Sequence, residues 1–207
     1  MHRIMDHIER SANNRQRLQR GIIRFGSISK HHTIHKRPDE VLAREVPGHW
    51  EGDLIKGAAN RSAVGTLVER KSRYVVLARM QGTGADAALD AFTRHFRHIP
   101  ACVRKTLTYD QGKEMARHEE LARRVRIQVY FADPHSPWQR PSNENANGLI
   151  REYLPKGMDL SGVRQAELNN IARLLNHRPR KCLDFATPAE VFQQDIMNLK
   201  CPVALQT

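Results

Sequence analysis

The sequence predicts an α/β fold built on a mixed β-sheet that is flanked by helices. Three observations support this prediction. Three short strand-type segments come first, and a helical pattern, a fourth strand, a short helix and a fifth strand follow. The chain then continues in helical patterns alone. Its 207 residues are enough to bury one sizeable core.

The first three predicted strands lie at 49–56, 63–69 and 74–80, separated by short turn-like stretches typical of an antiparallel meander. Alternation along the first strand places Glu51 and Asp53 on one face. Two carboxylates on one face of a central strand are costly unless a donor or a cation satisfies them, whereas on an exposed edge the cost vanishes. Asp53 is therefore a candidate functional residue.

A helix is predicted next, because apolar residues recur at helical spacing after two glycines: Ala85, Ala88, Leu89, Phe92 and Phe96. A fourth strand, 105–109, leads directly into Asp110. A short helix at about 113–124 and a fifth strand at 127–131 follow. Ligands of open α/β sheets gather at the carboxyl ends of strands, which makes Asp110 a second candidate. A turn-forming aspartate before a glycine is the alternative.

The loop 132–141 contains three prolines and is not expected to be regular. Glu144 lies in the first turn of the next helix, where the helix dipole favours a carboxylate. Gly148, one turn later, costs about 1 kcal/mol of helix propensity relative to alanine, and leaves room for a ligand. One buried face of this helix is predicted from Ala146, Leu149, Ile150, Tyr153 and Leu154. Two more helices follow, around 168–175 and after the capping sequence that starts at Thr187.

Charge favours a polyanionic partner. The formal net charge is +12, and Lys and Arg that neutralise phosphates release counterions. Residues 1–40 are predicted to be a basic, partly helical arm or linker, 41–195 the core and 196–207 a tail. Three histidines of the arm could suggest a metal site, but no cysteine or carboxylate stands beside them at ligand spacing, so a linker is favoured: His31, His32 and His35.

The three cysteines are widely spaced and form no CxxC pair, which argues against a disulfide framework or a zinc ribbon and fits a reducing cytoplasm. No apolar run approaches the ~20 residues that span a bilayer, and the first residues lack the apolar stretch of a signal peptide. We therefore expect a soluble cytoplasmic protein without a membrane partner.

Three acidic residues are stronger candidates for a functional site together than each is alone: Asp53, Asp110 and Glu144. Mg²⁺ and Mn²⁺ take oxygen ligands and keep waters and substrate phosphates in their shell. Two such ions ~4 Å apart can activate a hydroxyl and steady the leaving oxygen of an in-line displacement. The sequence therefore predicts a divalent-metal site for phosphoryl transfer.

Several motifs resemble the catalytic domain of bacterial transposases of the insertion sequence 30 family: GHWEGDLIKG, VGTLVERKSRYVVLARM, LTYDQGKE, DPHSPWQRPSNENANGLIREYLPKG, LNHRPRK and TPAEVF. The resemblance runs from about Arg37 to Phe192, and it implies a ribonuclease H-like fold with a DDE integrase core. It maps the catalytic triad onto Asp53, Asp110 and Glu144, with 33 residues between the last two, which is the spacing of that family.

The resemblance implies that a metal-activated water cleaves the ends of a mobile element and that the freed 3′ hydroxyl attacks target DNA. Two Mg²⁺ or Mn²⁺ ions are implied, with Asp53 bridging both, Asp110 binding one and Glu144 the other. Nearby residues are expected to contact DNA: Arg140, Asn143, Asn147, Arg151 and Lys156. Trp138 is expected to pack in the core rather than stack on a base. Transfer of two ends implies a homodimer or higher oligomer on DNA. The resemblance also implies a location in the bacterial cytoplasm, in association with the nucleoid.

Two departures from the family pattern stand out. Pro141 replaces the usual glycine and is expected to stiffen the loop that delivers Glu144. No helix-turn-helix pattern can be read in residues 1–37, which suggests a truncated gene product. The alternatives are a catalytically impaired DNA-binding remnant and another metal-dependent nuclease on the ribonuclease H-like fold.

Overall fold

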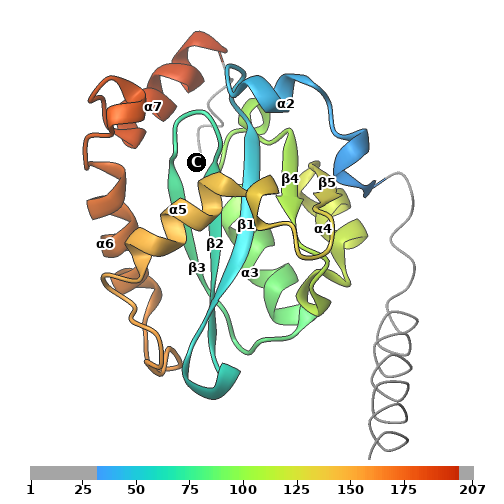
Figure 1. Ribbon diagram of the computed structural model, residues 1–207, viewed down its shortest axis with the longest axis vertical. Helices are drawn as coiled ribbons and strands as arrows, with labels where there is room; N and C mark the ends of the chain where they lie inside the picture. Colours follow the sequence, from blue (N-terminus) through green and yellow to red (C-terminus); the bar gives the residue numbers. More distant parts are fainter. Residues whose placement is uncertain (1–31, 201–207) are drawn as a thin grey trace, which may run out of the picture. The chain divides into compact units, whose positions relative to one another are not determined.

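A five-stranded mixed sheet forms the centre of the computed structural model, which describes residues 32–200. The strands lie in the order β3-β2-β1-β4-β5 (Figure 1). Their bounds are β1 (His49–Lys56), β2 (Ala63–Glu69), β3 (Val75–Arg79), β4 (Thr106–Tyr109) and β5 (Gln128–Phe131). β1 pairs antiparallel with β2 and parallel with β4, β2 pairs antiparallel with β3, and β4 pairs parallel with β5. The predicted mixed five-stranded sheet is confirmed.

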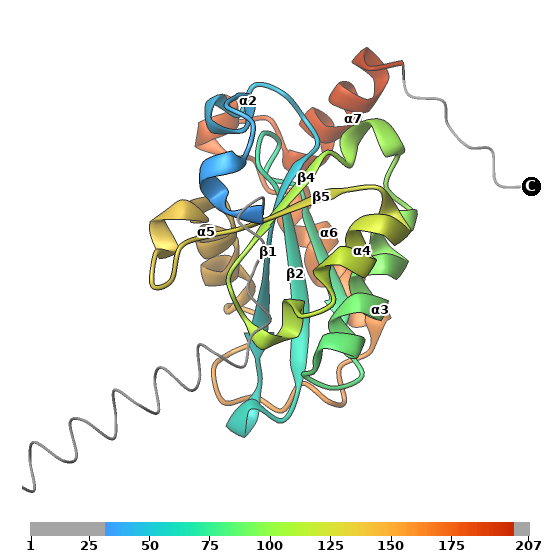
Figure 2. The same cartoon turned by 90° about the vertical axis from the view of Figure 1, so that its right-hand side faces the viewer.

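Helices cover both faces of this sheet (Figures 1 and 2). On one face α5 lies across β1 and β2, and α6 packs on β3, whereas α3 covers the other face and α4 packs beside β5. The helices are α2 (Glu40–Ala43), α3 (Ala85–Arg97), α4 (His118–Val125), α5 (Pro141–Ile150), α6 (Gln165–Asn176) and α7 (Pro188–Asn198). Short 3₁₀ turns connect them, including η2 (Ile34–Lys36), η5 (Lys113–Met115) and η6 (Pro137–Gln139).

Strand β1 presents different chemistry to its two faces. Trp50 packs edge-on against Phe96 of α3, with ring centroids 5.7 Å apart. Ile55 belongs to the buried cluster formed with Ile150 of α5 and Leu168 of α6. Because side chains alternate along a strand, Asp53 lies on the same face as Ile55, toward α5. The predicted alternation of this strand is confirmed.

Two helix predictions need correction. The helix expected at 113–124 is divided into η5 and α4, and the helix that carries Glu144 begins earlier and ends at Ile150. Pro141 is the first residue of α5, where its fixed φ suits the helix and no amide donor is needed, so it starts the helix rather than stiffening a loop. Tyr153 lies beyond the helix and is 38% exposed, outside the buried face on which it was predicted.

The segment that precedes α2 is attached to the sheet. Thr33 forms a parallel bridge with Phe131, and Arg37 donates to Thr108 Oγ1 at 3.0 Å. The predicted helix within residues 1–31 and the end of the predicted tail, residues 201–207, lie outside the described residues. Cys182 is free and exposed, whereas Cys102 is disulfide-bonded, which the cysteine spacing did not predict. No helix within the described range is long and apolar enough to cross a membrane.

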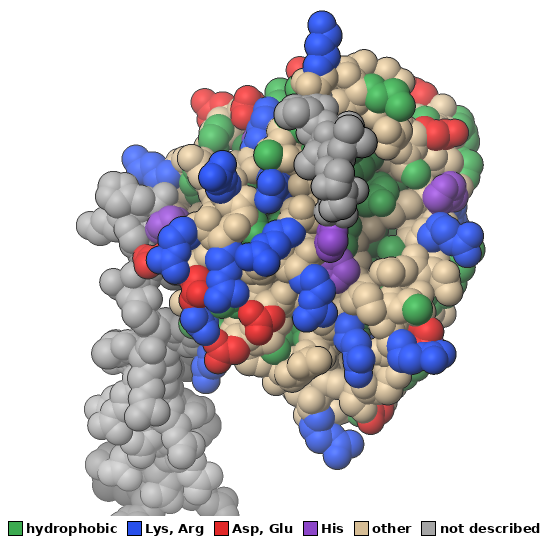
Figure 3. Space-filling model, turned by 180° about the vertical axis from the view of Figure 1, so that it is seen from behind, with side chains coloured by type: hydrophobic (Ala, Val, Ile, Leu, Met, Phe, Trp, Pro, Cys, Tyr) green, Lys and Arg blue, Asp and Glu red, His purple; other side chains and the backbone are tan. Residues whose placement is uncertain are grey.

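The face opposite α5 carries both signs of charge, and Figure 3 shows basic side chains with acidic ones among them. Arg117 of the η5–α4 connection pairs with Asp86 of α3 and with Glu120 of α4. Arg124 of α4 pairs with Asp90 of α3 at 3.3 Å and with Glu120 at 2.5 Å. The arginines of this face are thus partly neutralised within the protein.

Candidate active site

Asp53 and Asp110 lie side by side because β1 and β4 are parallel neighbours. Asp53 is within β1, and Asp110 directly follows β4. The guanidinium of Arg140 links them: its Nη1 lies 3.7 Å from Asp53 Oδ1, and its Nη2 lies 3.5 Å from Asp110 Oδ2. Since one guanidinium reaches both carboxylates, the two acids belong to a single site.

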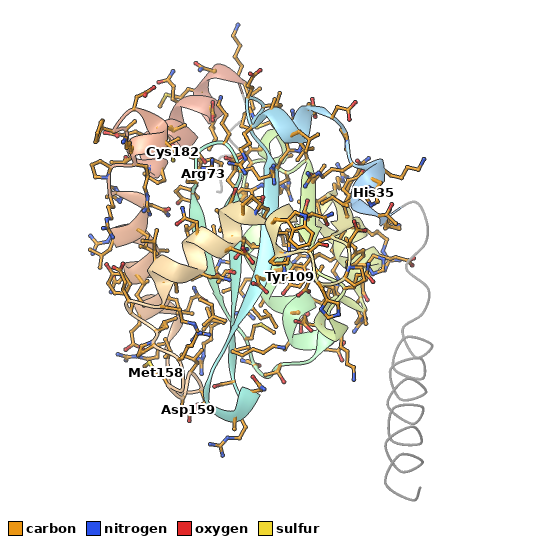
Figure 4. All side chains as sticks on the ribbon, in the orientation of Figure 1. His35, Arg73, Tyr109, Met158, Asp159 and Cys182 are labelled. Carbon is orange, nitrogen blue, oxygen red and sulfur yellow. The ribbon has the colours of Figure 1, made fainter. Side chains whose placement is uncertain are left out.

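Arg140 is held inside this site. It is only 9% exposed, and its Nη1 donates to the carbonyl of Gly52 at 2.8 Å. Its guanidinium carbon lies 6.0 Å from the ring centroid of Tyr109, which is labelled in Figure 4. The arginine therefore compensates the charge of the two aspartates. Its predicted contact with DNA stays a prediction.

The carboxyl group of Asp53 is fixed by two donors. Oδ1 accepts from the backbone N–H of Leu54 at 2.8 Å, and Oδ2 accepts from Asn147 Nδ2 at 2.9 Å. Burial raises the pKa of Asp53, and the nearby charges of Asp110 and Glu114 raise it further, while Arg140 and the Leu54 N–H oppose the shift. The site therefore concentrates negative charge to an extent that a bound cation would relieve.

Glu114 is an acidic residue of this site that the sequence reasoning did not select. It belongs to η5, and a Cβ added at Gly112 would come within 2.6 Å of its carboxylate. Burial raises the pKa of Tyr109, and the charges of Asp53, Glu114 and Asp110 raise it further. Glu114 lies in the same TYDQGKE stretch as Asp110. It was not selected because an acidic residue in the first turn of a predicted helix is common and needs no functional explanation.

Glu144 is an exposed residue of α5, and its backbone N–H donates to the carbonyl of Arg140 at 3.2 Å. It precedes Asn147 by three positions, so both side chains lie on one side of the helix, and Asn147 contacts Asp53. Within residues 32–200, three metal-type ligands lie within 4.8 Å of one another only at His32, His118 and Glu119. The carboxylates of Asp53, Asp110 and Glu144 therefore do not all lie within 4.8 Å of one another, and the joint role of the three acids stays a prediction.

Asn143 has a different role from the one predicted. It is fully buried, its backbone N–H donates to Glu51 Oε2 at 2.8 Å, and its Nδ2 donates to the Glu51 carbonyl at 3.0 Å. Its Oδ1 accepts from Thr66 Oγ1 at 3.1 Å. The prediction that Asn143 contacts DNA is wrong, because its amide is satisfied inside the protein. Asn143 instead fixes α5 on β1 and β2.

Two further predicted DNA contacts, Arg151 and Lys156, follow the C-terminal end of α5. Arg151 donates to the carbonyls of Leu154 and Lys56 at 3.2 and 3.1 Å, and Lys156 is exposed. Their contact with DNA stays a prediction.

Trp138, in η6, is 69% exposed, so the prediction of core packing is wrong. The short proline-led turn that carries it lies on the surface and gives the indole no core to enter.

The residues of this site suit a divalent cation with oxygen ligands. The side chains of Asp53 and Asp110 are 27% and 41% exposed, so both can reach solvent and substrate. Asn147 Oδ1 is buried, without a hydrogen-bond partner in the described part of the chain. Mg²⁺ and Mn²⁺ favour carboxylate and amide oxygens and retain several waters, which a half-open acidic site allows.

Comparison with known proteins gives a consistent result. Residues 43–137 match the integrase core domain family. The chain is 56% identical over 179 residues to the transposase for insertion sequence element IS1086 of Cupriavidus metallidurans, covering 86% of this chain and 53% of that protein. It is 47% identical over 163 residues to the transposase InsI for IS30A of Escherichia coli K12, covering 79% and 42%. The chain thus spans about half the length of these relatives.

The structure also resembles a solved one, described as a simian T-cell lymphotropic virus intasome in complex with the PP2A regulatory subunit B56 gamma. The TM-score is 0.55 at 16% identity, covering 71% of this chain and 55% of that chain, a likeness that concerns the fold alone. Together with the five-stranded mixed sheet and the matching domain, it confirms the predicted ribonuclease H-like fold. The chain thus contains an integrase core domain at residues 43–137 and is similar, over about half of their length, to transposases of the insertion sequence 30 family.

Proposed function

We propose that Asp53, Asp110 and Glu144 form the site at which this chain cleaves DNA at the ends of a mobile element and joins the freed 3′ hydroxyl to target DNA. The observation that carries the proposal is the position of Arg140, which brings the acids of β1 and β4 to one place. When bound, two Mg²⁺ or Mn²⁺ ions activate the attacking hydroxyl and stabilise the leaving oxygen.

The chain's own residues orient the oxygen ligands. Leu54 and Asn147 fix the two oxygens of Asp53, and the backbone N–H of Gly112 donates to Asp110 Oδ1 at 3.1 Å. Glu144 adds its carboxylate from α5, on the side of the helix that carries Asn147. Arg140 then stands beside the transferring phosphate as a fixed cation, which supports charge building on the phosphoryl oxygens.

A basic hollow beside the start of α5 supports DNA binding next to this site. Its volume is about 510 Å³, and its lining includes Arg37, Arg44, Arg70 and Trp138. Burial lowers the pKa of Arg44, and the positive charges of Arg73 and Arg70 lower it further, so several cations are concentrated here. Arginines contact phosphates, and an exposed indole can stack on an unpaired base, as at a frayed DNA end. We call this surface the arginine hollow.

The experiment is strand transfer by the full chain, using a pre-cut DNA end, a target duplex and Mg²⁺. The Asp110→Asn variant is expected to lose the joined product at least 100-fold while retaining its DNA affinity. Asp90→Asn, an exposed aspartate of α3, is the matched control and should keep full activity. Equal activity of Asp110→Asn and the unmodified chain would instead mean that the acidic site does no chemistry.

Two rival functions give different results in the same assay. A DNA-binding remnant would bind the end without joining it, and a nuclease for RNA–DNA hybrids or junctions would cut those substrates without strand transfer.

Because two ends are joined, we propose assembly as a homodimer or higher oligomer on DNA, in the cytoplasm and at the nucleoid. Light scattering with and without the pre-cut end measures that assembly.

A further inference from the structure

A second group of metal-type ligands lies outside the acidic site, at His32, His118 and Glu119. One ligand atom from each lies within 4.8 Å of the others. His32 precedes η2, whereas His118 and Glu119 are the first residues of α4, so distant parts of the sequence meet here. We propose that these three side chains bind a divalent transition-metal ion of the zinc class, which fastens the segment beginning at His32 to α4.

The tautomers of both histidines are set for metal binding. His32 Nδ1 lies 3.0 Å from the Val129 carbonyl, and His118 Nδ1 lies 3.0 Å from the Met115 carbonyl. A carbonyl oxygen only accepts, so each Nδ1 must carry the proton and each Nε2 must carry the lone pair. Metal-binding histidines are oriented in this way, with the other ring nitrogen donating to a backbone carbonyl or a carboxylate.

His118 Nε2 is buried and has no hydrogen-bond partner among residues 32–200. A buried nitrogen lone pair without a partner is unfavourable and calls for an explanation. The ring itself is held in place by edge-on contacts with His32 and Phe131, at centroid distances of 5.2 and 4.8 Å. The ring is therefore held in one orientation, and a metal ion bound at Nε2 would satisfy this nitrogen.

The donor set selects the class of metal. Two imidazole nitrogens and one carboxylate form a site for Zn²⁺ that keeps one position for water, whereas Mg²⁺ prefers oxygen ligands alone. Bonds of about 2.0–2.1 Å hold tetrahedral ligand atoms about 3.4 Å apart. Glu119 is exposed, so its side chain can rotate the short distance that this closure requires.

The position of the site indicates what the ion would do. The same segment is already attached at β5 by the bridge from Thr33 to Phe131 and by the hydrogen bond between His35 Nε2 and Asp133 Oδ2 at 2.9 Å. A metal ion at His32 would add a link to α4. It would thereby restrain His32 and the turn η2 that follows it. The proposed role is structural, and no step of the DNA chemistry depends on it.

The experiment titrates Zn²⁺ into the chelator-treated full chain by calorimetry and follows thermal unfolding with Zn²⁺ or Mg²⁺. Glu119→Gln is the main variant, because this side chain is exposed and its loss should leave the fold intact. His32→Gln is the second variant. We expect both to weaken one Zn²⁺ site at least tenfold and to remove the rise in unfolding temperature that Zn²⁺ gives the unmodified chain. His98→Gln, at the exposed histidine directly after α3, should change neither the Zn²⁺ affinity nor the unfolding temperature.

The Asp53→Asn variant separates this site from the acidic one. Zn²⁺ binding that persists in Asp53→Asn and weakens in Glu119→Gln supports the proposal. Binding that is lost in Asp53→Asn but kept in Glu119→Gln and His32→Gln places the ion at the acidic site and overturns it. Tight binding in all three variants places the ion elsewhere in the chain and also overturns it, as does an unmodified chain that binds no Zn²⁺.

Discussion

The backbone N–H of Asn143 donates to Glu51 Oε2 at 2.8 Å, and this bond joins the first turn of α5 to β1. The other carboxylate oxygen of Glu51 is paired with Arg70. Glu51 is fully buried, so it is not available to substrate. The helix that carries Glu144 is thus positioned by an acid that takes no part in the chemistry, two residues before Asp53 on the same face of the strand.

Replacing Glu51 by alanine should lower the free energy of unfolding by about 3–5 kcal/mol, because Arg70 would be left buried without its partner. Strand transfer should fall as well, since α5 loses its anchor. Urea denaturation measures the loss of stability. Glu45→Gln, at an exposed position before β1, should stay within about 0.5 kcal/mol of the unmodified chain. A loss below about 1 kcal/mol for Glu51→Ala would contradict this account of the anchor.

Asp53→Asn should raise stability at neutral pH while it abolishes activity. The pKa of Asp53 is raised above its ordinary value of 3.8, chiefly by burial. The folded state therefore holds the proton more tightly than the unfolded state, so this group's contribution to stability is fully present below pH 3.8 and is lost as the pH rises through the folded pKa. The variant does not suffer that loss.

Thermal unfolding in chelator, measured from about pH 4 to pH 8, checks this prediction. The gap in unfolding temperature between Asp53→Asn and the unmodified chain should widen as the pH rises. Asp90→Asn, at an exposed site, should show no such gap. Added Mg²⁺ should narrow the gap by stabilising the unmodified chain alone. A gap that shrinks with rising pH would show that the shift has the opposite sign.

Gly148→Ala should stabilise the protein by about 1 kcal/mol and still reduce strand transfer. No heavy atom lies within 4 Å of a Cβ added at this exposed helical position, so the folded chain has room for it. If DNA approaches α5 here, beside Glu144, the methyl group would obstruct the substrate. Urea denaturation and strand-transfer assays of the same preparation give both quantities, and an active, stabilised variant would show that the space is not used.

Gly52→Ala provides the contrasting glycine substitution. A Cβ at this position of β1 would lie 2.7 Å from the ring of Tyr109, which is fully buried. We expect a loss of about 1–3 kcal/mol from overpacking, together with lower activity, because Tyr109 directly precedes Asp110. Urea denaturation measures this loss, and unchanged stability would show that the ring can move aside.

Arg44→Gln should weaken DNA binding several-fold for every sequence tested and reduce the slope of log K against log salt by about 1, as expected for one phosphate contact. Trp138→Ala should weaken binding of single-stranded ends by about 1–3 kcal/mol and leave duplex binding almost unchanged. Arg94→Gln, on the exposed side of α3, is the control for charge alone. Fluorescence anisotropy at several salt concentrations measures all three, and equal effects of Arg44→Gln and Arg94→Gln would exclude a specific role for the arginine hollow.

Local patterns predicted the strands and the two aspartates well. The alternation in β1 placed Glu51 and Asp53 on one face, and the strand that ends at Tyr109 placed Asp110 at its carboxyl end. The partners of these acids could not be predicted in this way, because Arg70, Arg140 and Asn143 approach them only through tertiary packing. The sequence showed that a buried acid needs a donor but did not show which one.

The errors have a related cause. Asn143 lies three residues after Arg140 and Trp138 two residues before it, yet Asn143 is buried and Trp138 is exposed. Such differences depend on which side of a short turn or helix meets the sheet. A sequence motif places all residues of the stretch 138–143 near the site, but it does not show which of their side chains are buried and which are exposed. The structure separates the residues that build the site from those that face solvent.

The parallel pairing of β1 with β4 has a consequence for the order of folding. Between these strands the chain must first run through β2, β3 and α3, so Asp53 and Asp110 meet only when a long loop closes. A nascent or partly unfolded chain that has formed only its first hairpin holds one of the two aspartates of the proposed site. Asp53 and Asp110 therefore come together only when β4 pairs with β1, and they separate when that pairing opens.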